Sequence, residues 1–301
     1  MVSGDQQRSA AGFLTETHQV SERRVARALG RSRSTLRYRR RARTGDASLV
    51  KALRRLANRH RRYGYRRLRA LLVRDGWTVN VKRVRRLCRS LGLQTRKRRR
   101  TKGKSPHPGT AANSCQARPA TRPNEVWTCD FIHDRTVSGG SLKWLSVVDE
   151  YTRELLMLHP AATMTAADVR RRFGRLIGWR GRPQRLRCDN GGEFVGAALA
   201  DWLPGQGVEL TPVAAASPWQ NGFVESFHSR LRDEFLDGAE FENVADAAAR
   251  AACFKREYNE VRPHSGLNYA TPKAFAARCG ETAGGRKRVG AGGNPPDSVR
   301  A

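Results

Sequence analysis

Three acidic residues in the second half of the chain have the types and spacing of a catalytic site. Asp130 lies inside Glu125–Ile132, a segment rich in β-branched and aromatic residues that predicts a strand. A carboxylate there is costly unless something pairs with it. Asp189 ends a second expected strand, Arg185–Cys188, and Glu225 lies on an expected long helix, with 35 residues between these two acids.

Three carboxylates that converge on one point repel one another unless cations neutralise them. Hard oxygen ligands suit Mg²⁺ or Mn²⁺, and two such ions about 4 Å apart clamp the attacking and leaving oxygens of a phosphodiester displacement. Taken alone, Asp130 could pair with a core arginine, Asp189 could form a turn, and Glu225 could be an exposed helix residue. The combined spacing and the words DNGGEF and SPWQNGFVES favour catalysis over these structural alternatives.

The elements that would position these acids form an α/β domain over residues 121–278. Three hairpin strands are followed by alternating helices and strands, which indicates a mixed five-stranded sheet with flanking helices. Thr165 is expected to cap a helix reaching about 178, a second helix is expected over 193–203, and Ser217-Pro218 should open a helix that ends near 236. Residues 279–301 are expected to be a disordered tail. The expected strands are Glu125–Ile132, Leu142–Val148, Glu154–His159, Arg185–Cys188 and Val208–Thr211.

The net charge of +31 is unevenly distributed. Residues 1–120 hold 34 basic and 5 acidic residues, whereas the remainder holds 24 and 22. This surplus argues against an ordinary metabolic enzyme and predicts a polyanionic partner for the first part of the chain. The six cysteines form no C-x-x-C pair, which argues against a zinc ribbon, and no apolar run is long enough to span a membrane. We therefore expect a cytoplasmic, nucleoid-associated protein.

Two basic helical modules precede the α/β domain. Residues 1–44 comprise a tail and two short helices with helix-turn-helix spacing, whose second helix would enter a major groove with Arg33, Arg37 and Arg39 outermost. The alternative is a basic hairpin that touches phosphate only. Residues 45–94 should form a second DNA-binding module of three helices, with Arg66 and Arg67 on its surface, and 95–120 a flexible basic linker. Its expected apolar faces comprise Leu49, Leu53, Leu56, Leu68, Leu71, Leu72, Val81, Val84, Leu87 and Leu91.

The motifs together resemble a known family. They are W-x-x-D ending at Asp130, DNG-x-EF beginning at Asp189, the 35-residue interval, SPWQNG ahead of Glu225, and YNEVRPHSGLNYATPKAF at 258–275. In these words the chain resembles OrfB-type insertion-sequence transposases, of the group called insertion-sequence family three, whose catalytic core is similar to that of retroviral integrases. The resemblance covers nearly the whole chain.

The resemblance implies a ribonuclease-H-like fold in which Asp130, Asp189 and Glu225 hold two Mg²⁺ or Mn²⁺ ions. It further implies that four side chains lie near the substrate DNA: Asn190, Gln220, Asn221 and Arg232. For the C-terminal signature we favour packing and a tight turn over a catalytic role; its residues are Tyr258, Arg262, Pro263 and His264. The family commonly has proline where this chain has Gly192, and Cys129 and Cys188 directly precede two of the acids. Both thiols should face the core, because adjacent strand side chains point to opposite faces.

The expected partners are double-stranded DNA, as element ends and as target, and further copies of the chain bound to that DNA. An upstream-frame protein or a frameshift fusion is a further expected partner, and the resemblance implies a circular intermediate. Two rival functions are a DNA-binding regulator and a metal-dependent nuclease without strand transfer. The three spaced carboxylates count against the regulator, and the attached DNA-binding modules count against a simple nuclease.

Overall fold

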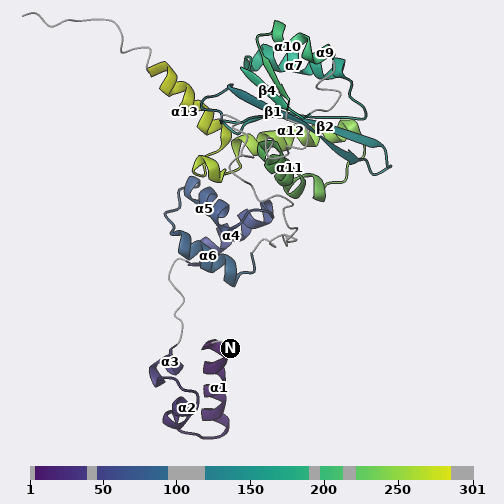
Figure 1. The fold of residues 1–301 in the computed structure, drawn as a ribbon. Coiled ribbons are helices and arrows are strands. Elements are labelled where there is room, and N and C mark those ends of the chain that lie inside the picture. The colour runs from purple at the N-terminus through teal and green to yellow at the C-terminus, as the bar shows by residue number, and fades with distance from the viewer. Residues whose placement is uncertain (1–3, 39–45, 94–118, 190–196, 213–221, 286–301) are drawn as a thin grey trace, which may run out of the picture. The chain divides into compact units, whose positions relative to one another are not determined.

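The computed structural model describes residues 4–38, 46–93, 119–189, 197–212 and 222–285 (Figure 1). The chain forms two compact units, residues 1–52 and 53–301, and each is described by itself. Among the helices of the described segments, none combines the length and apolar character needed to cross a bilayer.

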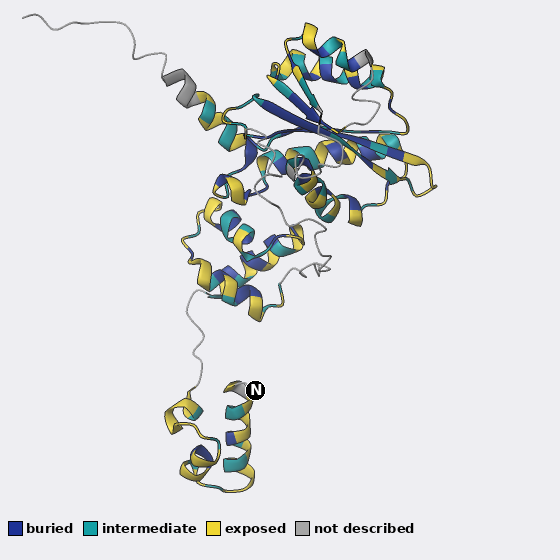
Figure 2. Ribbon diagram, viewed as in Figure 1, coloured by how far each residue is buried: buried dark blue, intermediate teal, exposed yellow. Residues whose placement is uncertain are grey.

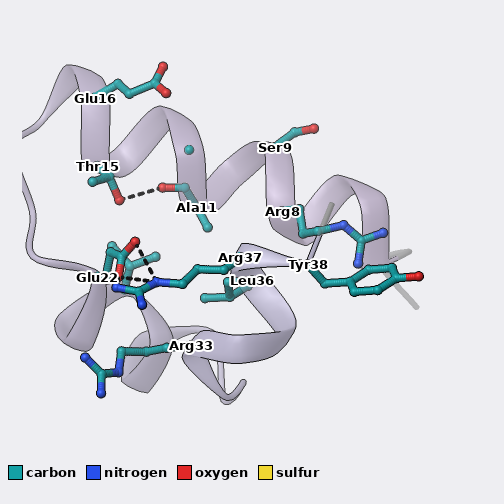
Figure 3. A pocket seen from close by; sticks show the side chains of 12 residues that line it. Arg8, Ser9, Ala11, Thr15, Glu16, Glu22, Arg33, Leu36, Arg37 and Tyr38 are labelled. Carbon is teal, nitrogen blue, oxygen red and sulfur yellow. Dashed lines mark hydrogen bonds and ion pairs between the residues drawn. The ribbon is translucent and has the colours of Figure 1, made fainter. Parts of the chain in front are cut away.

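Within the N-terminal unit, residues 4–38 form three helices, α1 (Gly4–Thr17), α2 (Glu22–Ala28) and α3 (Arg33–Arg37). The Ser32 hydroxyl accepts a hydrogen bond from the Thr35 amide, so it caps α3 as the sequence indicates, whereas the Ser21 side chain makes no capping bond to α2. The tail expected before residue 20 is instead largely helical. A cavity of about 590 Å³ opens between the three helices (Figure 3).

The second unit begins inside α4 (Asp46–Arg59) and continues through α5 (Tyr65–Arg74) and α6 (Val81–Ser90). Asn80 caps α6 by accepting a hydrogen bond from the Lys82 amide. The expected apolar positions of these helices are buried or half-buried, with one exception. Val81 is 41% exposed, because it is the first residue of α6 and lies beside the cap rather than on the packed face.

The described residues between 119 and 285 form the α/β domain around one five-stranded sheet with the order β3-β2-β1-β4-β5. The first three strands are antiparallel, and β4 and β5 run parallel to β1. This is the mixed sheet of the ribonuclease-H-like fold that the sequence predicts. The strands are β1 (Val126–Arg135), β2 (Ser141–Asp149), β3 (Leu155–Ala161), β4 (Arg185–Cys188) and β5 (Glu209–Pro212).

Helices cover both faces of the sheet, and a separate apolar core fills each side (Figures 1 and 2). Trp127, Cys129 and Phe173 belong to the core on the side of α7 (Ala166–Arg180), α9 (Ala197–Ala200) and α10 (Trp202–Gly205). A capping box closes the start of α7 at Thr165, as expected from the sequence.

The opposite core contains Ile132, Trp144 and Phe227, and it is covered by α11 (Gly222–Glu234) and α12 (Val244–Glu260). Short turns of 3₁₀ helix, η3 (Leu236–Gly238) and η4 (Ser265–Leu267), follow these two helices. The last helix, α13 (Pro272–Gly285), corrects one expectation: residues 279–285 are helical and do not belong to a disordered tail.

Candidate active site

Asp130 lies in the middle of β1, on the face of the sheet that α11 covers. Strand alternation points Trp127 and Cys129 into the opposite core, so Asp130 and Ile132 share the α11 face. The Asp130 side chain is 20% exposed. Its Oδ1 accepts a hydrogen bond from the Phe131 amide at 2.7 Å, which fixes one oxygen and leaves Oδ2 for other contacts.

Asp189 follows the last residue of β4 at the level of Asp130. In the parallel pair of β1 and β4, Thr128 lies opposite Arg187, and two further residues along each strand lead to Asp130 and Asp189. Asp189 is exposed. Adjacent parallel strands therefore bring two carboxylates to the same level of the sheet, at the carboxyl end of β4.

Glu225 reaches the same region from the first turns of α11. Phe227 and Leu231 anchor this helix in the core beneath β1 and β2, which leaves Glu225 exposed. The pKa of Asp130 is raised to about 6, mainly by burial; the Phe131 hydrogen bond opposes this shift, and the charges of Asp189 and Glu225 contribute to it. Asp189 and Glu225 are thus both close enough to act electrostatically on Asp130.

These three oxygen donors suit a hard divalent cation. Such an ion would favour the charged form of Asp130, which burial and the two neighbouring carboxylates disfavour. The thiols of Cys129 and Cys188 are buried in the opposite core, as the sequence predicts, so they do not supply soft ligands here. Within the described residues, no three acidic, cysteine or histidine side chains are gathered closely enough to enclose an ion. Residues 190–196 and 213–221, which flank Asp189 and precede α11, lie outside the described part.

The predicted DNA-contacting residues of the N-terminal unit have different surroundings. Arg33 is exposed at the start of α3. Arg37 is also exposed and forms an ion pair with Glu22 of α2 (Figure 3). Arg39 lies outside the described residues.

In the second unit, Arg66 is exposed and donates to the Tyr65 hydroxyl at 3.2 Å. Arg67 has protein partners instead: its Nη1 donates to Glu234 Oε1 at 2.8 Å, and its guanidinium lies over the Tyr63 ring. Arg67 therefore takes part in the packing of this unit, and its predicted contact with DNA stays a prediction.

Arg232, two turns after Glu225, is exposed and donates to the His133 carbonyl at 3.3 Å. The other predicted contacts around the site, Asn190, Gln220 and Asn221, lie outside the described residues. In the C-terminal signature, Tyr258, Arg262 and His264 are buried, in keeping with the packing role that the sequence favours.

One residue beside the triad was not singled out in the sequence. His228, on α11, places Nδ1 3.5 Å from Asp130 Oδ2. Burial lowers the pKa of His228 to about 4, and the Arg232 charge adds to that effect. Its spacing of three residues after Glu225 puts it on the same helical face, and this was the available signal.

Family comparisons agree with this geometry. Residues 120–218 and 206–272 each match an integrase core domain, and residues 45–101 match an HTH-like domain. An uncharacterized 31.7 kDa protein of insertion element IS407 from Burkholderia multivorans is 39% identical over 270 residues, which cover 90% of this chain and 95% of that protein.

Two further relatives show the same pattern. An uncharacterized 39.2 kDa protein of insertion element IS476 from Xanthomonas euvesicatoria is 35% identical, covering 90% of this chain and 76% of that protein. Transposase InsD for insertion element IS2A/D/F/H/I/K of Escherichia coli is 30% identical, covering 71% of this chain and 73% of that protein. The chain belongs to the insertion-sequence transposases that carry an HTH-like domain and an integrase core.

Proposed function

We propose that this protein is the transposase of a bacterial insertion sequence and that Asp130, Asp189 and Glu225 carry its chemistry. The observation that supports the proposal best is that the charges of Asp189 and Glu225 both act on the half-buried carboxylate of Asp130. Asp130 and Asp189 lie at one level on adjacent strands, and the charge of Glu225 reaches Asp130 from α11. The reaction is a polynucleotidyl transfer on double-stranded DNA.

The three carboxylates would hold Mg²⁺ or Mn²⁺, in the form of two ions. When bound, these ions supply charge neutralisation at the phosphate and lower the pKa of an attacking water. The Phe131 amide donates a hydrogen bond to Asp130 Oδ1, and this bond restricts the direction in which Asp130 Oδ2 would face the ion. Asp189, at a strand end, and Glu225, on a helix, are both exposed and would contribute their carboxylates from these two elements.

Two in-line displacements account for cutting and joining. Water attacks a phosphodiester at the end of the element, the bond to the 3′ oxygen breaks, and a free 3′-hydroxyl and a 5′-phosphate result. That hydroxyl then attacks the phosphorus of a second phosphodiester; one P–O bond forms, the P–O bond to the 3′ oxygen of the attacked strand breaks, and that oxygen leaves as a new 3′-hydroxyl, so the number of P–O bonds and protons is unchanged. The first acceptor would be the other end of the same element, so a circular intermediate precedes insertion into the target. No side chain needs to become covalently attached to DNA.

The basic modules would hold the element ends and the target. Arg33 and Arg66 are exposed on them, and Arg232 is exposed on α11 beyond the triad. Arg37 would contact phosphate after exchanging its ion pair with Glu22, while Asn190, Gln220 and Asn221 would lie beside the cut strand. We further propose that several copies assemble on DNA and that an upstream-frame protein, separate or fused, takes part.

The test uses purified full-length protein and duplexes that carry the DNA flanking its gene. Asp130→Asn, Asp189→Asn and Glu225→Gln should each abolish cleavage and strand transfer in Mg²⁺ while DNA binding persists. Asp134→Asn, on the same strand but away from the triad, is the matched control and should remain active. Full activity in any triad variant would refute the assignment of that residue. Cleavage without joined products would favour the nuclease alternative.

A further inference from the structure

His228 lies on α11, the helix of Glu225, and its side chain contacts Asp130 on β1. It belongs to α11, one helical turn after Glu225, and its ring reaches the middle of β1 and β2. The side chain is 15% exposed. Its neighbours on this face of the sheet are otherwise apolar and include Ile132, Trp144 and Phe227.

Both ring nitrogens of His228 face polar atoms. Nε2 lies 2.9 Å from the Ser146 hydroxyl, and Nδ1 lies 3.5 Å from Asp130 Oδ2. The first distance is that of a hydrogen bond, whereas the second is too long for one and is a van der Waals contact. The ring is therefore fixed by Ser146 and lies against the carboxylate of Asp130.

Ser146 connects the histidine to the backbone of Asp130. These two residues are direct partners in the antiparallel pair of β1 and β2, and Ser146 is fully buried. Its hydroxyl donates to the Asp130 carbonyl at 3.1 Å. Because a hydroxyl has only one proton, it must accept from His228 Nε2–H. The hydrogen bonds thus run in one direction, from α11 through β2 to β1.

This polar pair is poorly explained by core packing alone. Buried polar groups cost free energy unless they are hydrogen-bonded, and apolar side chains of similar volume would fill the same space at lower cost. The pair adjoins the side chain of Asp130, whose Oδ1 is already held by the Phe131 amide. The ring contacts the other oxygen, so amide and imidazole together restrict the carboxylate from two sides.

We propose that His228, fixed by Ser146, is a positioning residue that sets the Asp130 carboxylate relative to Glu225 on α11. The proposal rests on the function proposed above, because it gives these carboxylates a divalent cation to hold. Residues that orient metal ligands typically contribute 10-fold to 100-fold in metal affinity. His228 would act through Asp130 and would touch neither the ion nor DNA.

The experiment measures Mn²⁺ binding to the full-length protein by the loss of the free-ion signal in electron paramagnetic resonance, without DNA. His228→Leu keeps the approximate volume but cannot donate to Ser146, and we expect it to weaken Mn²⁺ binding at least 10-fold. His228→Gln can place an N–H where Nε2 lies and should stay within threefold of the wild-type protein. Ser146→Ala should weaken binding as His228→Leu does, and the double variant should be no weaker than either single variant, because one link is broken in each.

Two controls separate the possible outcomes. His159→Leu changes another half-buried histidine of the same sheet, on β3, and should leave Mn²⁺ affinity unchanged. Asp130→Asn should abolish binding; if it binds Mn²⁺ normally, the proposed metal site is wrong. If Asp130→Asn loses binding while folded His228→Leu and Ser146→Ala bind as the wild-type protein does, the role of His228 is refuted. If His228→Leu does not fold, Ser146→Ala alone decides by the same criterion.

Discussion

We expect Glu234→Ala to lower the free energy of unfolding far more than Arg67→Ala, although both variants remove a member of one ion-pair cluster. Glu234 lies near the end of α11, with its side chain 9% exposed. Arg262 binds it through two hydrogen bonds, Nε to Oε2 and Nη2 to Oε1, both 2.6 Å long, and is itself 3% exposed. Arg67 adds a third bond at 2.8 Å but remains 24% exposed.

The difference in burial sets the magnitudes. Removing Glu234 leaves the Arg262 guanidinium buried without a counter-charge, and breaking a buried pair in this way costs about 3–5 kcal/mol. Removing Arg67 leaves the two-bond pair intact and takes away a partner that water can reach, for which the cost is about 1 kcal/mol. With a urea m-value of about 3 kcal/mol/M, Glu234→Ala should lower the unfolding midpoint by roughly 1 to 1.7 M.

The assay is urea unfolding of the full chain, followed by the fluorescence of tryptophans in the sheet.

Burial would raise the pKa of Glu234, but the hydrogen bonds and charges of Arg262 and Arg67 outweigh burial and hold that pKa below its ordinary value. A carboxylate with a lowered pKa stabilises the fold above its unfolded pKa, and this contribution is lost as the pH falls through the folded pKa. The gap between the wild-type protein and Glu234→Gln should therefore narrow as the pH is lowered below 4.5. Equal costs for Glu234→Ala and Arg67→Ala, or a cost for Glu234→Ala below about 1 kcal/mol, would refute the reasoning.

Three further outcomes are expected. The affinity for duplex DNA should fall steeply with KCl, and Arg33→Ala and Arg66→Ala should each make the slope of log K against log salt shallower by about 0.9; a flat response of the parent protein would contradict DNA binding by residues 20–104. Without metal, Asp130→Asn should raise the free energy of unfolding at pH 7 by about 1–3 kcal/mol, because the folded pKa of Asp130 is raised from 3.8 to about 6. That gain should vanish near pH 4, where Asp130 itself is protonated, and a lower melting temperature for the variant at pH 7 would argue against it. Thr165→Ala should cost about 1 kcal/mol by removing the capping box of α7, while Thr165→Ser should cost much less, and equal losses would show that the hydroxyl is not what matters.

Local signals predict much of the sheet because each strand carries its own pattern. The predicted strand Arg185–Cys188 has the same bounds as β4, and Thr165 caps α7 as expected. Helix α1 was missed because its apolar residues do not recur with a strong helical period. Residues 279–285 were expected to be disordered because this segment is rich in glycine, whereas in the structure they continue helix α13.

The individual roles of polar residues were harder to predict, because they depend on contacts between distant segments. Arg67 looks like any other surface arginine until Glu234, 167 residues later, is found against it. His228 likewise gains its meaning from Ser146 and Asp130, which lie on two other elements. A sequence pattern shows how residues are spaced along one helix or strand. It does not show which residues of different elements will meet, and these partners lie on different elements. The acids of the candidate site were the exception, because their spacing and flanking words resemble those of a known family.

The register of β1 on β2 links core packing to the placement of the candidate site. Trp127 and Cys129 occupy one core while Ile132 occupies the other, so both faces of β1 are specified by apolar burial. A slip by one residue would turn Asp130 into the opposite core and bring Cys129 to the face of α11. Such a slip is unfavourable because it would remove buried apolar side chains from both cores. The same register sets Ser146 directly across from Asp130 and beneath His228. The apolar residues of β1 therefore determine where its carboxylate lies, and the polar contacts of His228 and Ser146 can only refine an orientation that packing has already chosen.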